Sequence, residues 1–324
     1  MSVKKTNLIL SIESIDDLMR CINLASLLEV AGWPKPGNVH RTKNFVDTKF
    51  EHFLGGIAAI QPNFRKFCEK IYHLSNNDDQ KYKFIELGLF YKEAVEQMMK
   101  WQSGGNVLLG HILILAPLSA AASVCLKTNK LNFDDFKYYL NEIIDEASVE
   151  DTINLYKAIR LCNPGGLGQI KKFDINDENS FSDIRKEKIN LKKIFELSQN
   201  YDLISSEYST GFNIILSEGL PYFLKTFKEF NDSNIATVNT FLKILSEHHD
   251  TLIIRKSGLD TARNVSQVAY KILLKGGISS TEGLEMTIKL DKELQEKKGK
   301  SNPGTTADLI TGVILCALIF GLRL

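Results

Sequence analysis

Residues 107–126 form a nearly uncharged apolar run that constrains the fold more than any other part of the chain. A helix that is apolar on every face must be buried on every face. A run of this length can also cross a bilayer, so a membrane span is the alternative interpretation. However, Pro117 interrupts the run, and small residues such as Gly110 favour close packing. We therefore expect no membrane contact, and a buried central helix at residues 106–126.

The rest of the chain shows helical rather than strand periodicity. Helical patterns occur at 12–32, 48–76, 80–102, 149–161, 191–199, 206–230, 235–249, 258–275, 280–297 and 305–322, and a further helix starts at Asn132. Thr251–Ile254 is the only strand-like run, and it is short. The pattern predicts an all-α fold: a single large bundle-like domain, 1–324, around the central helix. The charged segment 171–190 is expected to be an exposed loop, either a lid or a plain surface loop.

Composition restricts the class of partner and the compartment. Forty Lys and Arg residues balance 39 Asp and Glu residues, for a net charge of +1. This argues against a general nucleic-acid binder, which usually has a strong basic excess. The five cysteines are scattered, odd in number and form no CxxC pair. We interpret them as reduced residues of a cytoplasmic protein, and the N-terminus lacks the apolar core of a secretory signal. The sequence does not indicate the oligomeric state.

Three short turns combine Asn with Pro-Gly: Pro36-Gly37-Asn38, Asn163-Pro164-Gly165-Gly166 and Asn302-Pro303-Gly304. Glycine lets backbone N–H groups approach a ligand closely, and proline stiffens the approach. Any one turn is explained by helix termination alone. The occurrence of three favours a phosphate-rich site, and we expect them to converge on one cleft. The absence of GxxxxGK[ST] and of a strand-led GxGxxG argues against a P-loop or Rossmann site.

The start of the central helix is a fourth candidate for anion binding. Gly104 and Gly105 precede Asn106, a residue type suited to helix N-capping. Free N–H groups and the helix dipole both favour an anion at such a terminus. We expect this glycine pair to join the same cleft.

Scattered acids supply candidates for metal binding and catalysis. Asp151 opens a helix, Glu207 lies in a Ser-Glu-Tyr-Ser-Thr-Gly run, Asp250 follows two histidines, and Asp308 follows the last Pro-Gly turn. Each one alone is more often a structural cap than a catalytic group. Together they could hold Mg²⁺ on a polyphosphate, because Mg²⁺ prefers a few carboxylates plus phosphate oxygens. The histidines have no zinc spacing, and no GxSxG elbow occurs.

An ordered set of segments resembles the triphosphoribosyl-dephospho-CoA synthase family from about residue 20 to the C-terminus. The segments are Pro34–Val39, Gly105-Asn106 with Gly110, Glu207–Phe212, Asp250-Thr251 with Arg255-Lys256, and Asn302–Leu309. Val107-Leu108-Leu109 stands where the bacterial enzymes have Thr-His-Lys, and Asn302–Asp308 replaces their Ser-Pro-Gly-Gly-Ser-Ala-Asp. The chain therefore resembles the divergent, archaeal-type branch most.

The resemblance implies an enzyme of coenzyme biosynthesis that binds ATP and a coenzyme-like hydroxyl acceptor. The 2′-hydroxyl of 3′-dephospho-CoA attacks C1′ of the ATP ribose, adenine leaves, and the triphosphate stays on the transferred sugar. An oxocarbenium-like transition state needs a base, nearby negative charge, an acid for adenine and cationic support. The sequence offers candidates for each role: Glu207, Asp250 and Asp308 as catalytic residues, with the base left open among the acids, and Asp151, Glu207, Asp250 and Asp308 as Mg²⁺ ligands. The candidates for nucleotide contacts are Lys35, Gly37, Asn38, Gly105, Asn106, Arg255, Lys256, Asn302, Gly304 and Thr305, with Arg41 as a further cation.

Two other functions remain open at this stage. One is a Mg²⁺-dependent nucleotide hydrolase or phosphotransferase, and the other is a non-catalytic helical nucleotide-binding protein. Incubation with ATP and Mg²⁺ separates the three. Free adenine indicates ribosyl transfer or ribosyl hydrolysis, ADP or AMP indicates phosphate chemistry, and neither product favours binding alone.

Overall fold

The computed structural model describes residues 8–73, 82–163 and 172–324, and every regular element in them is helical. The longer helices are α1 (Ile15–Ala31), α2 (Phe50–His73), α3 (Leu87–Trp101), α4 (Leu109–Thr128), α5 (Phe133–Asp145), α6 (Val149–Cys162), α10 (Leu220–Phe230), α11 (Ser233–Glu247), α13 (Leu259–Leu274), α14 (Thr281–Gln295) and α15 (Gly304–Ile319). The shorter elements are η1 (Lys83–Ile85), α7 (Ser180–Lys186), α8 (Leu191–Ser198), α9 (Leu203–Thr210), η2 (Ile214–Gly219), α12 (Thr251–Ser257) and η3 (Gly277–Ser279). The predicted all-α fold is confirmed.

Helix α4 is the buried central helix that the apolar run predicts. Helices α1, α2, α3, α5 and α15 all pack against it, and its residues from Ile112 to Ala122 are buried. By length and composition α4 is able to cross a membrane, but 83% of its apolar window is buried inside the protein. The helix begins at Leu109 with Leu108 at its N-cap position, so the predicted start at Asn106 is too early, although the Asn106 side chain accepts a hydrogen bond of 3.1 Å from the Leu109 amide.

Helix α15 is the second fully apolar helix, and two glycines let it approach α4 closely. A Cβ atom on Gly110 of α4 would lie 1.9 Å from an oxygen of Asp308, and one on Gly312 of α15 would lie 2.6 Å from Ile114. Such separations are impossible for real side chains, so glycine is required at both positions for this packing. The close approach brings the start of α15 against the first turn of α4.

The predicted continuous helix at 206–230 is wrong, because the chain breaks after α9. Gly211 has a φ of +70°, which ends α9, and η2 follows as a π-helix before α10 begins. The cause is the buried Glu207 side chain, whose two oxygens accept hydrogen bonds from the amides of Ile214 (2.8 Å) and Ile215 (2.9 Å). At the break, the Glu207 side chain accepts the hydrogen bonds of backbone amides that would otherwise pair with carbonyl groups of a continuous helix.

Two further segments differ from the predicted pattern. The expected loop 171–190 contains the helix α7, because Ile184 is fully buried and Arg160 of α6 stacks 4.3 Å from the Phe181 ring. The strand-like run at residues 251–254 is helical in α12, since Asp250 caps it through the Leu252 and Ile253 amides. In both cases tertiary contacts and capping override local propensity.

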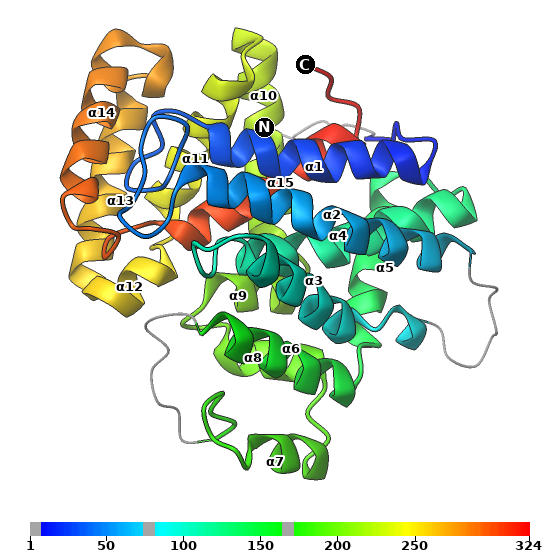
Figure 1. The fold of residues 1–324 in the computed structure, drawn as a ribbon. Coiled ribbons are helices and arrows are strands. Elements are labelled where there is room, and N and C mark those ends of the chain that lie inside the picture. Colours follow the sequence, from blue (N-terminus) through cyan, green and yellow to red (C-terminus); the bar gives the residue numbers. More distant parts are fainter. Residues whose placement is uncertain (1–7, 74–81, 164–171) are drawn as a thin grey trace.

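Helix α15, together with the helices around its start, positions the candidate site. Figure 1 shows α12, α13 and α14 grouped on one side of the molecule, whereas α7 lies at its lower end. Helix α15 runs through the middle and packs against α1, α4, α10 and α11. The start of α15 therefore meets the end of α1, the first turn of α4 and the short helix α12.

Candidate functional site

Two of the three Asn/Pro/Gly turns meet, as predicted. The side-chain amide of Asn38 donates to the carbonyl of Pro303 at 3.5 Å, and a Cβ on Gly37 would lie 3.2 Å from the Pro303 ring. Asp291 of α14 holds the first turn through the Gly37 amide (2.9 Å). Gly37 has a φ of +73°, a backbone conformation that L side chains rarely adopt. The first and last turns therefore pack against each other, although Asn38 and Pro303 are 265 residues apart in the sequence.

The described part of the structure does not show the remaining turn, at Asn163, or the Gly104-Gly105 pair in contact with the two turns that meet. Asn163 ends α6 with a φ of +40°, and the Pro-Gly-Gly that follows it lies outside the described residues. Gly104 accepts a hydrogen bond of 3.1 Å from the hydroxyl of Thr48, and Gly105 faces open space. The convergence of all four glycine segments therefore stays a prediction, with the first and third turns in contact.

A buried ion pair joins the end of α1 to the first turn. The Lys35 ammonium donates to the Glu29 carboxylate and, at 2.8 Å, to the Glu29 backbone carbonyl. Both side chains are only 2% exposed. Burial on its own would raise the pKa of Glu29, but the Lys35 charge and a hydrogen bond from His111 together hold that pKa below its usual value. The pair is therefore ionised inside the protein.

His111 of α4 connects this ion pair to the start of α15. Its Nε2 lies 3.2 Å from a Glu29 oxygen and 3.7 Å from an Asp308 oxygen. It also lies 2.9 Å from the Thr311 hydroxyl. The other ring nitrogen, Nδ1, is buried and has no hydrogen-bond partner among the described residues. The imidazole thus lies between two carboxyl groups from opposite ends of the chain.

Asp308 is the carboxyl group of this cluster that reaches the surface. Its side chain is 21% exposed, whereas those of Glu29, Lys35 and His111 are nearly fully buried. Its pKa is raised well above the usual value, first by burial and then by the negative charges of Glu29, Asp250 and Asp202, with Lys35 opposing the shift. A raised pKa favours the protonated form of a carboxyl group, and partial exposure leaves this one accessible to a ligand.

Asp250 lies near Asp308, but the fold already uses both of its oxygens. Oδ1 caps α12, and Oδ2 accepts hydrogen bonds from the Thr306 amide (2.7 Å) and hydroxyl (2.8 Å). Burial raises its pKa, and these hydrogen bonds oppose the shift. Thr305, the preceding residue, is buried and receives a hydrogen bond of 3.2 Å from Thr251. Asp250 therefore anchors α12 to the start of α15 and adds negative charge beside Asp308.

The structure gives Asp151 and Glu207 structural contacts away from this cluster. Asp151 completes a capping box with Ser148 and accepts a hydrogen bond of 2.8 Å from the Gly88 amide. Glu207 holds the start of η2, as described above, and burial raises its pKa to about 8. Since backbone amides already occupy these oxygens, neither residue enters the site proposed below.

The predicted phosphate-binding cations differ in their availability. Lys35 is engaged by Glu29, and Arg255 forms an ion pair of 2.7 Å with Asp202. Lys256 contacts only the Gly299 carbonyl, at 3.4 Å, among the described residues. Its pKa is lowered by partial burial and by the adjacent Arg255, while Asp250 opposes the shift. Lys256 is therefore the cation at this site whose charge an anionic ligand would best satisfy.

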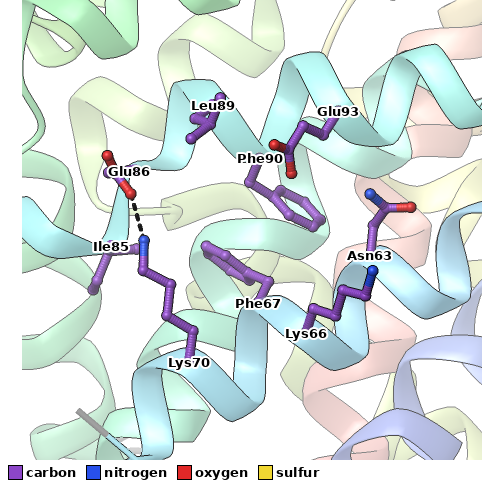
Figure 2. A pocket seen from close by; sticks show the side chains of 9 residues that line it. All are labelled: Asn63, Lys66, Phe67, Lys70, Ile85, Glu86, Leu89, Phe90 and Glu93. Atoms are coloured by element: carbon purple, nitrogen blue, oxygen red, sulfur yellow. Dashed lines mark hydrogen bonds and ion pairs between the residues drawn. The ribbon is translucent and has the colours of Figure 1, made fainter.

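Two hollows of the surface lie away from the acid cluster. Figure 2 shows one of about 110 Å³ between α2 and α3, where Lys70 pairs with Glu86 and the rings of Phe67 and Phe90 stack 4.3 Å apart. These contacts are ordinary helix packing, and the volume is small for a nucleotide. The second hollow, of about 460 Å³, lies between α11 and α13. We locate the candidate site by the charged cluster rather than by either hollow, because the cluster carries the groups able to do chemistry.

Sequence reasoning missed two members of the cluster, Glu29 and His111. Glu29 is a charged residue in the last turn of α1 and His111 interrupts the apolar run, so each is a polar group in an apolar setting. Such groups must find partners when buried. The sequence therefore holds a signal that these two residues need polar partners, but it does not say which residues those partners are.

The described residues do not form a preassembled metal site. They contain no group of three or more His, Cys, Asp or Glu side chains placed to hold a metal ion. The oxygens of Asp151, Glu207 and Asp250 are already hydrogen-bonded to the protein. The residues present therefore do not fit a resident Mg²⁺ ion held by the protein alone.

Comparisons with known proteins identify the family of this chain. Residues 15–323 match the family described as ATP:dephospho-CoA triphosphoribosyl transferase (CitG). The chain is 24% identical to a Vibrio cholerae protein named as a 2-(5''-triphosphoribosyl)-3'-dephosphocoenzyme-A synthase, over 90% of this chain and 84% of that one. The synthase of that name from Klebsiella pneumoniae is 32% identical over 104 residues, 32% of this chain and 34% of that protein. A crystal structure from Archaeoglobus fulgidus, described as a triphosphoribosyl-dephospho-CoA synthase, has a TM-score of 0.61 and 25% identity, and covers 83% of this chain and 100% of its own.

Proposed function

The chain belongs to the ATP:dephospho-CoA triphosphoribosyl transferase family, and from this premise we propose that it transfers the triphosphoribosyl group of ATP to the 2′-hydroxyl of 3′-dephospho-CoA. The observation that carries the proposal at this site is the partly exposed Asp308, held between His111 and Gly110 beside three other acids. Ribosyl transfer needs an acid for the leaving adenine and negative charge near C1′, and this cluster supplies both.

We assign Asp308 the role of proton donor to adenine. Adenine leaves poorly as an anion, so protonation in the transition state lowers the barrier to cleavage of the bond between C1′ and the base. Burial and the neighbouring negative charges raise the pKa of Asp308, which favours the protonated form that a proton donor needs. As that proton departs, the carboxylate gains negative charge close to the positive sugar, which electrostatically stabilises an oxocarbenium-like transition state. The bond from C1′ to the base breaks as the bond from C1′ to the acceptor oxygen forms, the proton of the 2′-hydroxyl passes to solvent, and solvent returns a proton to Asp308.

Glu29, Lys35 and His111 act on Asp308 as positioning residues. Glu29 contributes a fixed negative charge that raises the pKa of Asp308, and Lys35 keeps that charge ionised in the interior. His111 contacts both carboxyl groups through one nitrogen. The buried Nδ1 of His111 and Oδ1 of Asn302 have no partner among the described residues. They are polar groups near the start of α15 that a bound nucleotide would satisfy.

Binding of the triphosphate would position C1′ for the reaction. We propose that Lys256 meets the phosphates and that the glycine backbone of the two contacting turns lies nearby. Mg²⁺ would arrive as the counter-ion of ATP, mostly coordinated by phosphate oxygens, in keeping with its preference for few protein carboxylates. Binding energy from these remote groups would lower the barrier at C1′ without any reaction at phosphorus.

The compartment follows from the same substrates. ATP and dephospho-CoA are cytoplasmic metabolites, and all five cysteines are free and buried. We propose a cytoplasmic enzyme of coenzyme biosynthesis.

Product analysis of the purified full-length chain tests the proposal. With Mg·ATP and 3′-dephospho-CoA we expect free adenine, and label from γ-labelled ATP on the acceptor. Asp308→Asn should slow adenine release about 100-fold to 10,000-fold, the usual contribution of general acid catalysis. Asp260→Asn is the matched control, because Asp260 is 94% exposed and pairs only with its helix neighbour Arg263 among the described residues. Labelled inorganic phosphate, with adenine still on ribose, would refute ribosyl transfer.

A further inference from the structure

A basic hollow between α11 and α13 lies outside the site described above. It has a volume of about 460 Å³, within the range of small-molecule sites. The residues that line it and bear on its chemistry are His249, Arg263, Ser266, Gln267, Tyr270 and Lys271. No acidic residue lines the hollow, although acids and bases are nearly equal over the whole chain. The hollow therefore concentrates positive charge on an otherwise balanced protein.

The charges of this hollow are available to a ligand. Among the described residues Arg263 pairs only with the 94%-exposed Asp260, at 3.5 Å, and no carboxylate forms an ion pair with Lys271. An ion pair that is this exposed and this long contributes little. Three residues after Arg263 on α13, buried Ser266 is hydrogen-bonded to His249 at 3.1 Å. Arg263 thus presents a charge-assisted donor to an anion, with the polar groups of Ser266 and His249 on the same floor.

The opposite end of the hollow carries an aromatic surface. Tyr270 is 55% exposed, although a tyrosine ring gains by being covered. It follows Arg263 by seven residues on α13, which places it two helical turns, or about 10 Å, along the same face. Gln267 lies between them with an amide able to read a polar ring edge. A ligand with a phosphate at one end and an aromatic base at the other matches this spacing.

We propose that this hollow is a second ligand site, which binds a nucleoside phosphate with its phosphate on Arg263 and Ser266 and its base on Tyr270. The site is distinct from Asp308, and it does not depend on the proposed transferase activity. His249 directly precedes Asp250, but the two side chains have different partners: His249 contacts Ser266 of α13 and Asp250 contacts Thr306 of α15. A ligand in the hollow would therefore lie behind the loop that anchors the candidate active site.

Equilibrium dialysis of labelled ADP against the full chain tests the proposal in the Asp308→Asn background, where turnover is strongly slowed. The variant Arg263→Glu/Lys271→Glu should lose one ADP per chain or bind it at least about 100-fold more weakly, because the charge-assisted contact of Arg263 is reversed and a second positive charge of the hollow becomes negative. The matched control is Lys186→Glu/Lys193→Glu, which changes the net charge equally on exposed positions of α7 and α8. Circular dichroism of each variant verifies folding.

A second variant separates a nucleotide site from a simple phosphate site. Tyr270→Ala should weaken ADP at the hollow about 10-fold or more and leave inorganic diphosphate binding unchanged, since only the base stacks on the ring. Equal ADP affinity and stoichiometry in the hollow variant and its charge-matched control would overturn the proposal. Loss of ADP binding that is insensitive to Tyr270→Ala would refute the assignment of a base. Failure of adenine release in the unmodified enzyme would leave both binding results intact, so the two proposals fail separately.

Discussion

Replacing Lys35 by Met should destabilise the protein by about 3–5 kcal/mol at pH 7, the typical cost of removing one partner from a buried ion pair. Glu29 would then be a carboxylate only 2% exposed, with His111 Nε2, 3.2 Å away, as its remaining ion-pair contact among the described groups. The lost ammonium also leaves the Glu29 carbonyl without its 2.8 Å hydrogen bond. Methionine keeps the length of the side chain, so cavity formation contributes little.

The pH dependence of this loss has a definite sign. In the unmodified protein the Glu29 pKa is lowered, so its stabilisation is present above the unfolded pKa and disappears as the pH falls. In Lys35→Met burial dominates and raises that pKa, so the remaining penalty disappears when the carboxyl group is protonated. The difference in unfolding free energy between the two proteins should therefore shrink from pH 7 to pH 5.

Urea unfolding, followed by circular dichroism and by the fluorescence of Trp33 and Trp101, measures this difference and tests whether the transition is two-state. The control Lys70→Met removes a surface ion pair whose side chains are 38% and 51% exposed, and it should cost less than about 1 kcal/mol. The double variant Lys35→Met/Glu29→Gln should recover most of the loss. A loss below about 1 kcal/mol in Lys35→Met, or one that grows as the pH falls, would refute a buried ionised pair.

Other predictions follow from the same contacts. Gly110→Ala should strongly reduce adenine release, because its Cβ would lie 1.9 Å from an Asp308 oxygen; Gly55→Ala, whose nearest neighbour is 3.5 Å away, is the control. Asp308→Asn should gain stability over the unmodified protein as the pH rises from 5 to 8, since the raised pKa of Asp308 means that its ionisation opposes folding; a urea midpoint below that of the unmodified protein at pH 8 would contradict this. For Glu207, whose folded pKa is about 8, stability should fall between about pH 4.5 and 8 in the unmodified protein and less in Glu207→Gln, as compared by urea midpoints.

Local pattern alone was sufficient to predict the helical class and most helices. An apolar run with no polar face has one stable environment in a helical protein, the centre, and α4 occupies it. Capping residues also act locally, so Asn132, with two acids in the turn after it, could be read as the start of α5. The break at Gly211 could not, because it depends on a buried carboxylate reaching the amides of the next segment.

Only the tertiary structure decided which polar residues form the site. Asp151, Glu207, Asp250 and Asp308 look alike in the sequence, yet backbone amides occupy the first three, and Asp308 alone among them lies against His111. The pairing of Glu29 with Lys35, and the contact of His111 with both carboxyl groups, join α1, α4 and α15. Sequence determines what each side chain is able to do, but the energy of a buried charge depends on its distance from other charges. Those distances arise only when helices far apart in the chain pack together.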